Sequence, residues 1–136
     1  SVGRMTREHP TEHAEQVRLM QIVRLHESRY PALRLLFAVP NGGHRNKIAA
    51  AKLKAEGQKP GVPDLIFPVP MGGHVGLAIE LKSMTGYPSR EQKAWIGSLR
   101  EHGWRAEVCR GGDAAWQVIR EYVECYPHGS RARAVD

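Results

Sequence analysis

Apolar residues near the start of the chain recur every three or four positions, the spacing that places them on one face of a helix. The pattern runs from Glu12 to about Ser28, and Thr11 stands where a helix N-cap is expected. The predicted helix turns an apolar stripe to the core and a polar face to solvent. The stripe consists of Leu19, Met20, Ile22 and Val23.

Farther along the chain, short apolar runs alternate with longer amphipathic segments, and glycine and proline separate them. The short runs predict strands at 33–39, 65–69, 75–82 and 104–110. The longer segments predict helices at 47–56, 90–102 and 113–125. Ser89 and Gln92 match a capping box that opens the second of these helices. The order α–β–α–β–β–α–β–α predicts an α/β fold with a mixed central sheet flanked by helices.

The chain has 136 residues, the length of one domain. We expect the folded part to span 11–126, with flexible polar ends at 1–10 and 127–136. The two cysteines fit no metal or redox motif, and the first residues lack the apolar core of a signal peptide. No apolar run reaches the roughly 18 residues of a membrane helix. We therefore expect a cytoplasmic protein with reduced thiols and no membrane contact.

The chain is basic, with a formal net charge of +6 at pH 7. Lysine and arginine displace counterions from phosphates, so this charge favours a polyanionic partner such as nucleic acid. A basic surface kept for solubility is the alternative, and the charge alone does not separate the two.

The predicted hairpin between 65–69 and 75–82 brings two acids together. If its turn centres on Gly72, residues whose numbers add to 144 face each other, and Asp64 and Glu80 form such a pair. Their Cβ atoms would lie about 4.5–5.5 Å apart. Two like charges at that separation destabilise a sheet unless a cation joins them, and a hard divalent ion with oxygen ligands suits the position.

Lys82 follows Glu80 by two residues and therefore points to the same face of the strand. Its ammonium group can steady an attacking water or the negative charge that develops on a phosphate. Two acids, one metal ion and one lysine are what metal-assisted phosphodiester hydrolysis requires. The alternative is an exposed strand face with a salt bridge.

Pro63-Asp64 followed by Glu80-Leu81-Lys82 resembles the PD-(D/E)XK nuclease signature. The surrounding segments make the likeness specific, and from 11 to about 122 the chain is similar to the VRR-NUC (virus-type replication-repair nuclease) family. The segments that carry the resemblance are Pro40-Asn-Gly-Gly43, Ala51-Lys-Leu-Lys-Ala-Glu-Gly57, Pro60-Gly-Val-Pro-Asp64, Ile79-Glu-Leu-Lys82 and Ser89-x-x-Gln92.

This resemblance implies a restriction-endonuclease-like PD-(D/E)XK core, with 11–126 as the nuclease domain, that uses Mg²⁺ or Mn²⁺. Asp64, Glu80 and the Leu81 carbonyl would be metal ligands, and Lys82 would orient or activate water. Glu12, followed one turn later by Gln16, matches the family's helical acid and would complete the metal shell, with Glu15 as a rival for that role. Gln92 would support the site, a role compatible with its place in the capping box.

The resemblance also implies a DNA substrate, branched or junction DNA by analogy with Holliday-junction resolvases, and a homodimer in a bacterial or phage-infected cell. Apolar residues on the helices at 47–56 or 113–125 could form the dimer contact. DNA contacts are expected where backbone amides and basic groups can meet a phosphate, although the loop there could equally be a simple turn. The expected contacts are Asn41, Gly42, Gly43, His44, Arg45 and Lys47.

Two other functions fit parts of the sequence. A non-catalytic DNA-binding module on a nuclease fold would keep the fold and the basic charge, but the intact set of Asp64, Glu80 and Lys82 argues against it. A metal-dependent nucleotide hydrolase is disfavoured because the chain has no P-loop or equivalent nucleotide-binding motif.

Overall fold

The computed structural model describes residues 10–40 and 46–125. The ends expected to be flexible, 1–10 and 127–136, lie outside these ranges apart from Pro10. In chain order the elements are α1 (Glu12–Leu25), the 3₁₀ helix η2 (Pro31–Leu35), β1 (Phe37–Ala38), α2 (Lys47–Ala55), β2 (Leu65–Phe67), β3 (Leu77–Lys82), α3 (Arg90–Glu101), β4 (Arg105–Arg110) and α4 (Gly112–Val123).

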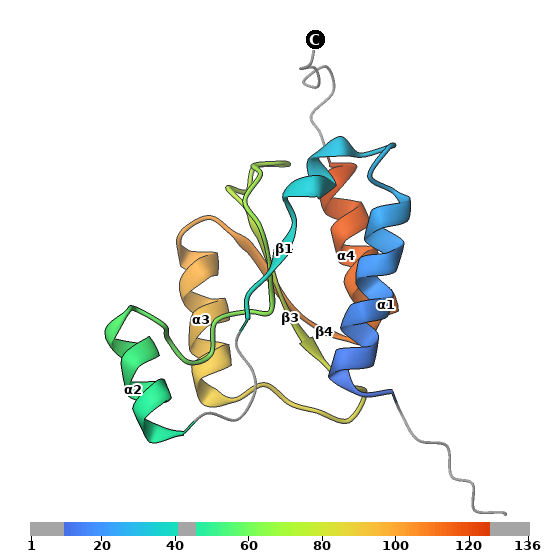
Figure 1. The fold of residues 1–136 in the computed structure, drawn as a ribbon. Coiled ribbons are helices and arrows are strands. Elements are labelled where there is room, and N and C mark those ends of the chain that lie inside the picture. Colours follow the sequence, from blue (N-terminus) through green and yellow to red (C-terminus); the bar gives the residue numbers. More distant parts are fainter. Residues whose placement is uncertain (1–9, 41–45, 126–136) are drawn as a thin grey trace, which may run out of the picture.

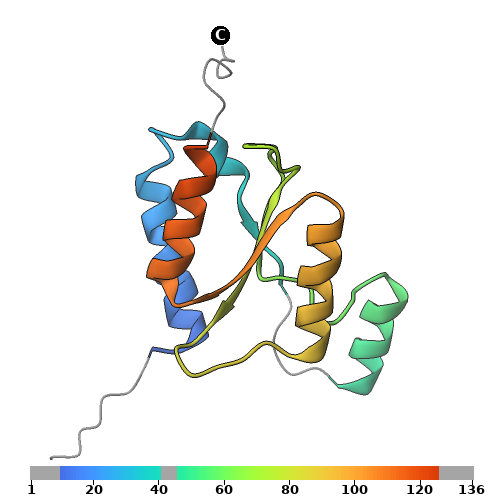
Figure 2. The same ribbon diagram turned by 180° about the vertical axis from the view of Figure 1, so that it is seen from behind.

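A four-stranded mixed sheet in the order β1-β2-β3-β4 forms the centre of the domain. The pairs β1–β2 and β2–β3 are antiparallel, whereas β3 and β4 are parallel and joined through α3. Helices α1 and α4 lie side by side on one face, and α3 covers the other (Figures 1 and 2). Helix α2 lies outside α3, away from the sheet (Figure 1). The predicted mixed sheet flanked by helices is confirmed.

Strand β3 is buried along its whole length, and each of its two faces packs against a different set of side chains. Leu77, Ile79 and Leu81 belong to the larger apolar cluster, which α1 and α4 complete with Leu19 and Ile119 among others. On the opposite face, Ala78 packs with Ile96 of α3 and Ala106 of β4. Because side chains alternate along a strand, Glu80 and Lys82 share the Ala78 face.

The β2–β3 hairpin has the register that the turn at Gly72 predicts. Leu65 pairs with Ile79 and Phe67 pairs with Leu77, and both pairs of numbers add to 144. A bridge between Met71 and His74 closes the turn. Gly72 adopts φ +60° inside it, a left-handed conformation that glycine reaches at no steric cost.

The predicted strand at 33–39 is wrong over most of its length. Residues Pro31–Leu35 form the 3₁₀ helix η2, and only Phe37–Ala38 are strand. Pro31 fixes φ at the first helical position, and Leu33 and Leu36 are both buried because a 3₁₀ helix brings residues three apart to one side. The limits of the other elements lie within three residues of the predicted ones, and the differences are those usual where helices and strands fray.

Helix α4 receives its N-terminal cap from another helix. Its own N-cap, Gly111, has no side chain, and the N–H of Gly112 instead donates to Oε1 of Glu15 on α1 at 2.7 Å. Arg18 of α1 adds an ion pair to Asp113 at 2.7 Å. The buried carboxylate of Glu15 therefore joins the first helix to the last.

Within residues 10–40 and 46–125, no helix is long and apolar enough to cross a membrane. Cys109 is buried in the core, Cys125 is exposed, and neither forms a disulfide.

Replacing Glu15 with alanine should lower the free energy of unfolding by about 1–3 kcal/mol, because the buried N–H of Gly112 loses its acceptor. Urea denaturation followed by circular dichroism measures this change. The matched control is Glu12→Ala on the same helix, whose side chain is 46% exposed and which should shift stability by less than about 0.5 kcal/mol. Equal losses in both variants would show that Glu15 does not cap α4.

Candidate active site

Asp64 and Glu80 meet at the point where β2 begins, one step beyond the Leu65–Ile79 pair in the same register. The backbone fixes Asp64 from both sides: its carbonyl accepts the N–H of Val39 at 2.8 Å, and its Oδ2 accepts the N–H of Leu81 at 2.7 Å. The charge of Asp64 in turn raises the pKa of Glu80. The register therefore places the two acids at facing positions, as the turn predicts.

The segment before Asp64 is held against α3. Gly61 adopts φ +85°, and a Cβ atom built on it would lie 2.6 Å from the carbonyl carbon of Glu91. The indole N–H of Trp95 donates to the carbonyl of Pro60 at 3.1 Å. Only glycine permits this close approach, so Gly61 and the two flanking prolines set the path by which the chain reaches Asp64.

Glu80 is almost fully buried, with 1% of its surface exposed. Its Oε1 atom is buried and finds no hydrogen-bond donor among the described residues. Burial and then the nearby charge of Asp64 raise the pKa of Glu80 to about 8. Burial also raises the pKa of Asp64, against the opposing hydrogen bond from Leu81. Without a cation the pair therefore holds a proton near neutral pH.

Lys82 provides a positive charge beside this pair. It is 8% exposed, and its Nζ lies 3.4 Å from Oε2 of Glu80 and 3.9 Å from Oε2 of Glu12. One ammonium group thus lies between a buried acid on β3 and an exposed acid at the start of α1. The ammonium group partly compensates the negative charge of the buried carboxylate. It pairs with Oε2 of Glu80, and Oε1 stays without a hydrogen-bond donor among the described residues.

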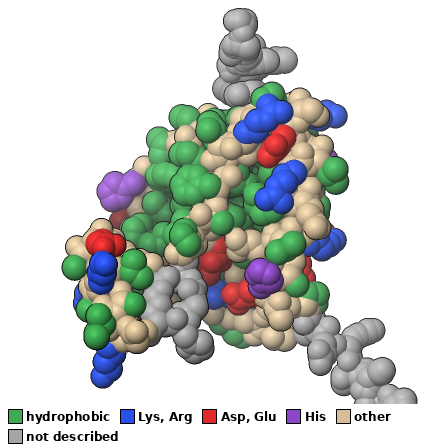
Figure 3. Space-filling model, in the orientation of Figure 1, with side chains coloured by type: hydrophobic (Ala, Val, Ile, Leu, Met, Phe, Trp, Pro, Cys, Tyr) green, Lys and Arg blue, Asp and Glu red, His purple; other side chains and the backbone are tan. Residues whose placement is uncertain are grey.

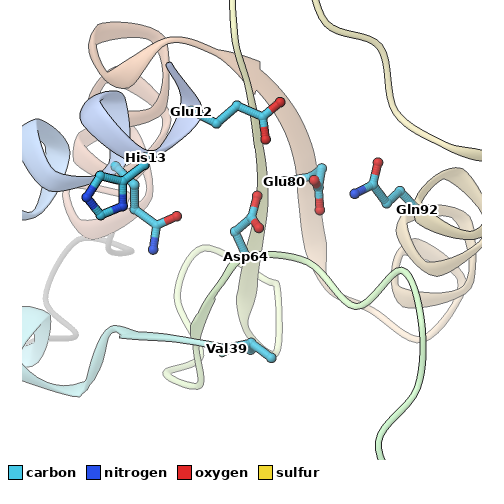
Figure 4. A pocket seen from close by; sticks show the side chains of 7 residues that line it. Glu12, His13, Val39, Asp64, Glu80 and Gln92 are labelled. Atoms are coloured by element: carbon cyan, nitrogen blue, oxygen red, sulfur yellow. The ribbon is translucent and has the colours of Figure 1, made fainter. Parts of the chain in front are cut away.

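Glu12 and Glu15, the two acids in the first turn of α1, have different surroundings. Glu12 points toward Asp64 and Glu80 (Figure 4), whereas Glu15 is occupied by the cap of α4. Gln92 faces the acids from the opposite side on α3, and its side chain also accepts the N–H of Ser89 in the predicted capping box (Figure 4). The geometry therefore favours Glu12 over Glu15 as the helical acid of this site.

These side chains surround an open cavity of about 420 Å³. In the space-filling view, acidic side chains gather in a hollow on this face, below a surface with many hydrophobic side chains (Figure 3). Two lining residues, His13 and Val39, were not singled out from the sequence. The sequence indicates the place of His13 only through its neighbour Glu12, which it follows directly on α1. The cavity is lined by Glu12, His13, Gln16, Val39, Asp64, Glu80 and Gln92.

The oxygen atoms of Asp64 and Glu80 are of the kind that Mg²⁺ or Mn²⁺ prefers, and the bare Oε1 of Glu80 is a free ligand position. The set is incomplete as it stands, because among the described residues no three His, Cys, Asp or Glu side chains come close enough to hold a metal ion together. Glu12 reaches the cavity but pairs with Lys82. Such an ion would therefore need backbone or water oxygens in addition to the two carboxylates.

The expected DNA contacts fall mostly outside the described residues. Asn41, Gly42, Gly43, His44 and Arg45 lie in the range 41–45, which the structure does not describe. Lys47 is described, as the exposed first residue of α2. Asn46 precedes it as the N-cap, accepting the N–H of Ala49 at 2.7 Å.

A mixed sheet that carries two facing acids and a lysine on its central strands is typical of a nuclease-type domain. A model of the VRR-NUC domain family matches residues 10–113, and the chain therefore belongs to the VRR-NUC domain family. A solved structure described as a VRR_NUC domain protein is 29% identical, with a TM-score of 0.69 over 87% of this chain and 92% of that chain. Among curated proteins the comparison finds no match.

The metal-free protein should lose stability as the pH rises from 4.5, the ordinary pKa of a glutamate, to about 8. In this range the folded state keeps a proton on Glu80 that the unfolded chain has released, so raising the pH favours unfolding. Urea midpoints measured in EDTA across this range test the slope.

The control for this measurement is Glu80→Gln, which keeps the shape of the side chain and cannot ionise. It should show a flatter profile than the wild type, and histidines common to both proteins cancel in the difference. Parallel profiles would mean that Glu80 is already ionised in the folded protein at low pH.

Proposed function

We propose that this protein is a divalent-metal-dependent DNA endonuclease that hydrolyses phosphodiester bonds. The observation that carries the proposal is the buried, unpartnered oxygen of Glu80 beside the carboxylate of Asp64. A buried carboxylate oxygen without a hydrogen-bond donor is costly, and such atoms persist mainly where a ligand or a reaction uses them. Membership of the VRR-NUC family supports the same conclusion.

Asp64, Glu80 and the Leu81 carbonyl would hold Mg²⁺ or Mn²⁺, with Glu12 completing the set if it leaves Lys82. When bound, the ion polarises a phosphate oxygen and lowers the pKa of a coordinated water. The fit rests on hard oxygen donors and on one carboxylate oxygen without a donor.

Two further side chains of the candidate site, Lys82 and Gln92, can act on the water or the phosphate. The ammonium group of Lys82 can donate hydrogen bonds to a water or to the charge that develops on the phosphate. Its burial makes that interaction stronger than in bulk water. The amide of Gln92 faces the same space from α3 and can orient a water or a phosphate oxygen (Figure 4).

The partner in this proposal is DNA, because the chain carries a net charge of +6 and phosphates attract such surfaces. Lys47 at the start of α2 and residues 41–45 are the expected contacts with the phosphate backbone. These contacts would position the duplex and carry no sequence information.

Asp64→Asn and Glu80→Gln should each abolish cleavage of DNA in Mg²⁺ or Mn²⁺ while DNA binding remains. Each substitution keeps the side chain's shape and removes a charged ligand. Lys82→Met keeps the aliphatic stem, and it should lower the cleavage rate by roughly 10²–10³-fold, the usual loss of one stabiliser of transition-state charge. Gel assays on single-stranded, duplex, flap and four-way-junction DNA measure these rates, and calorimetry measures metal binding.

Glu107→Gln is the matched control, since Glu107 is an ion-paired strand carboxylate that does not line the cavity. It should cut like the wild type. Wild-type cleavage by Asp64→Asn or Glu80→Gln would contradict the proposed site. DNA binding without cleavage by the wild-type protein would favour a non-catalytic DNA-binding module instead.

We infer that the substrate of this nuclease is branched or junction DNA. We also infer that the protein acts on this substrate as a homodimer. Two cuts on a symmetric junction take two sites in a fixed relation, which a twofold dimer supplies most simply. Of the two helices considered for the contact, α4 buries apolar residues such as Ile119 in the core, whereas α2 buries none of its residues. Ile48 of α2 is 82% exposed. We therefore assign the dimer contact to α2.

Light scattering coupled to gel filtration should give twice the chain mass of 15.2 kDa for the wild type. Ile48→Asp should give the single-chain mass and lose paired nicks on a four-way junction, because a charge replaces the exposed apolar contact. Leu25→Asp, at a position 78% exposed on α1, is the matched control and should stay dimeric. A monomeric wild type that leaves junctions whole would overturn this part and leave the nuclease proposal standing.

A further inference from the structure

The connection from β3 to α3, residues 83–89, carries an aromatic side chain on the surface. Tyr87 is 79% exposed, the largest exposure of any aromatic residue among those described. The guanidinium of Arg110 lies over its ring, 4.7 Å from the centroid. Arg110 covers one face of the ring, and the high exposure leaves the other face open to solvent.

Arg110 holds this loop as well as the ring. Its Nε and Nη2 donate to the carbonyl of Gly86 at 3.2 and 2.8 Å. Arg110 is itself fixed at the end of β4, where it pairs with Lys82 in the parallel register. The loop is therefore fastened to the strand beside the candidate active site.

Gly86 brings the loop close to Glu12 and Lys82 of the candidate site. A methyl group built on Gly86 would lie 3.5 Å from Oε2 of Glu12 and 3.6 Å from Cδ of Lys82. Tyr87 is the next residue in the chain. An open aromatic face thus lies one residue from the groups that would act on a phosphate, and α1 begins beside this loop (Figure 1).

We propose that Tyr87 is a stacking platform for an unpaired base of DNA next to the phosphate that is cut, and that Arg110 is the positioning residue that holds it. This inference rests on the proposed function and narrows its substrate to DNA with an unpaired nucleotide at the cleavage site. Every base has a π-face, so stacking on tyrosine recognises unpaired bases whatever their sequence. A base inside a continuous duplex is already stacked on its neighbours and does not reach the ring.

The positive charge of Arg110 supports this assignment. Stacked on the covered face, the guanidinium limits the motion of the ring, so less freedom is lost when a base stacks on the open face. Its positive charge, 4.7 Å from the ring centroid, also attracts the phosphates of a bound strand. A tyrosine that served only to fasten the loop would not need an open face directly after the residue that approaches Glu12 and Lys82.

The test measures binding in the Glu80→Gln background, so that cleavage plays no part. The probe is an oligonucleotide branch with 2-aminopurine at an unpaired position beside the branch point, compared with the same base in a continuous duplex. Stacking on tyrosine should quench the fluorescence of the unpaired probe. Adding Tyr87→Ala should weaken binding of the unpaired probe by roughly 5- to 100-fold, remove the quenching, and leave duplex binding unchanged.

Tyr87→Phe keeps the ring and should behave as the parent. Arg110→Lys keeps the charge and loses the planar group, so it should reduce quenching at saturating DNA while duplex binding is retained. Leu25→Ala, at an exposed apolar site on the far end of α1, is the matched control and should change neither quantity.

Unchanged binding and quenching in Tyr87→Ala would overturn the stacking proposal and leave the nuclease assignment intact. Failure of the parent protein to bind any of the DNA probes would instead overturn the proposed function, and the stacking platform with it.

Discussion

Backbone hydrogen bonds of the sheet hold Asp64 and Glu80 at facing positions. The β2–β3 register brings them opposite each other, and the N–H groups of Val39 and Leu81 fix Asp64 at its carbonyl and its carboxylate. The resulting repulsion, together with burial, raises the pKa of both acids. The stability of the apolar core on the other face of β3 offsets this unfavourable contact, and so the sheet tolerates two facing acids.

The helices around the sheet complete the surroundings of this pair in different ways. Helix α1 brings Glu12 toward the cavity and uses Glu15, one turn later, to cap α4. Helix α3 brings Gln92 through a capping box that also starts the helix. Lys82 on β3 lies between the acids of the sheet and the acid of α1. The side chains of the candidate site therefore come from elements whose positions depend on one another.

Local patterns in the sequence were sufficient for the central part of this arrangement. The glycine turn fixes the hairpin register, so the contact between Asp64 and Glu80 follows from the positions of the two acids relative to Gly72. The choice between Glu12 and Glu15 could not be made, because it depends on the docking of α4, a contact between residues 97 positions apart. The 3₁₀ helix at Pro31–Leu35 was missed because a short apolar run fits a strand and a tight helix equally well. The place of Tyr87 depended on Arg110, which no local pattern connects to it.

The bond between Glu15 and Gly112 has a consequence for the order in which the protein is made. Helix α1 leaves the ribosome early, but the amide that holds it is synthesised 97 residues later. At roughly 5–20 residues per second, this delay is on the order of 5–20 s. During that time Glu12 lacks the anchoring contact that fixes its helix beside the sheet. A partial chain therefore lacks the finished arrangement of acids, and the growing protein reaches it only when its final helix docks.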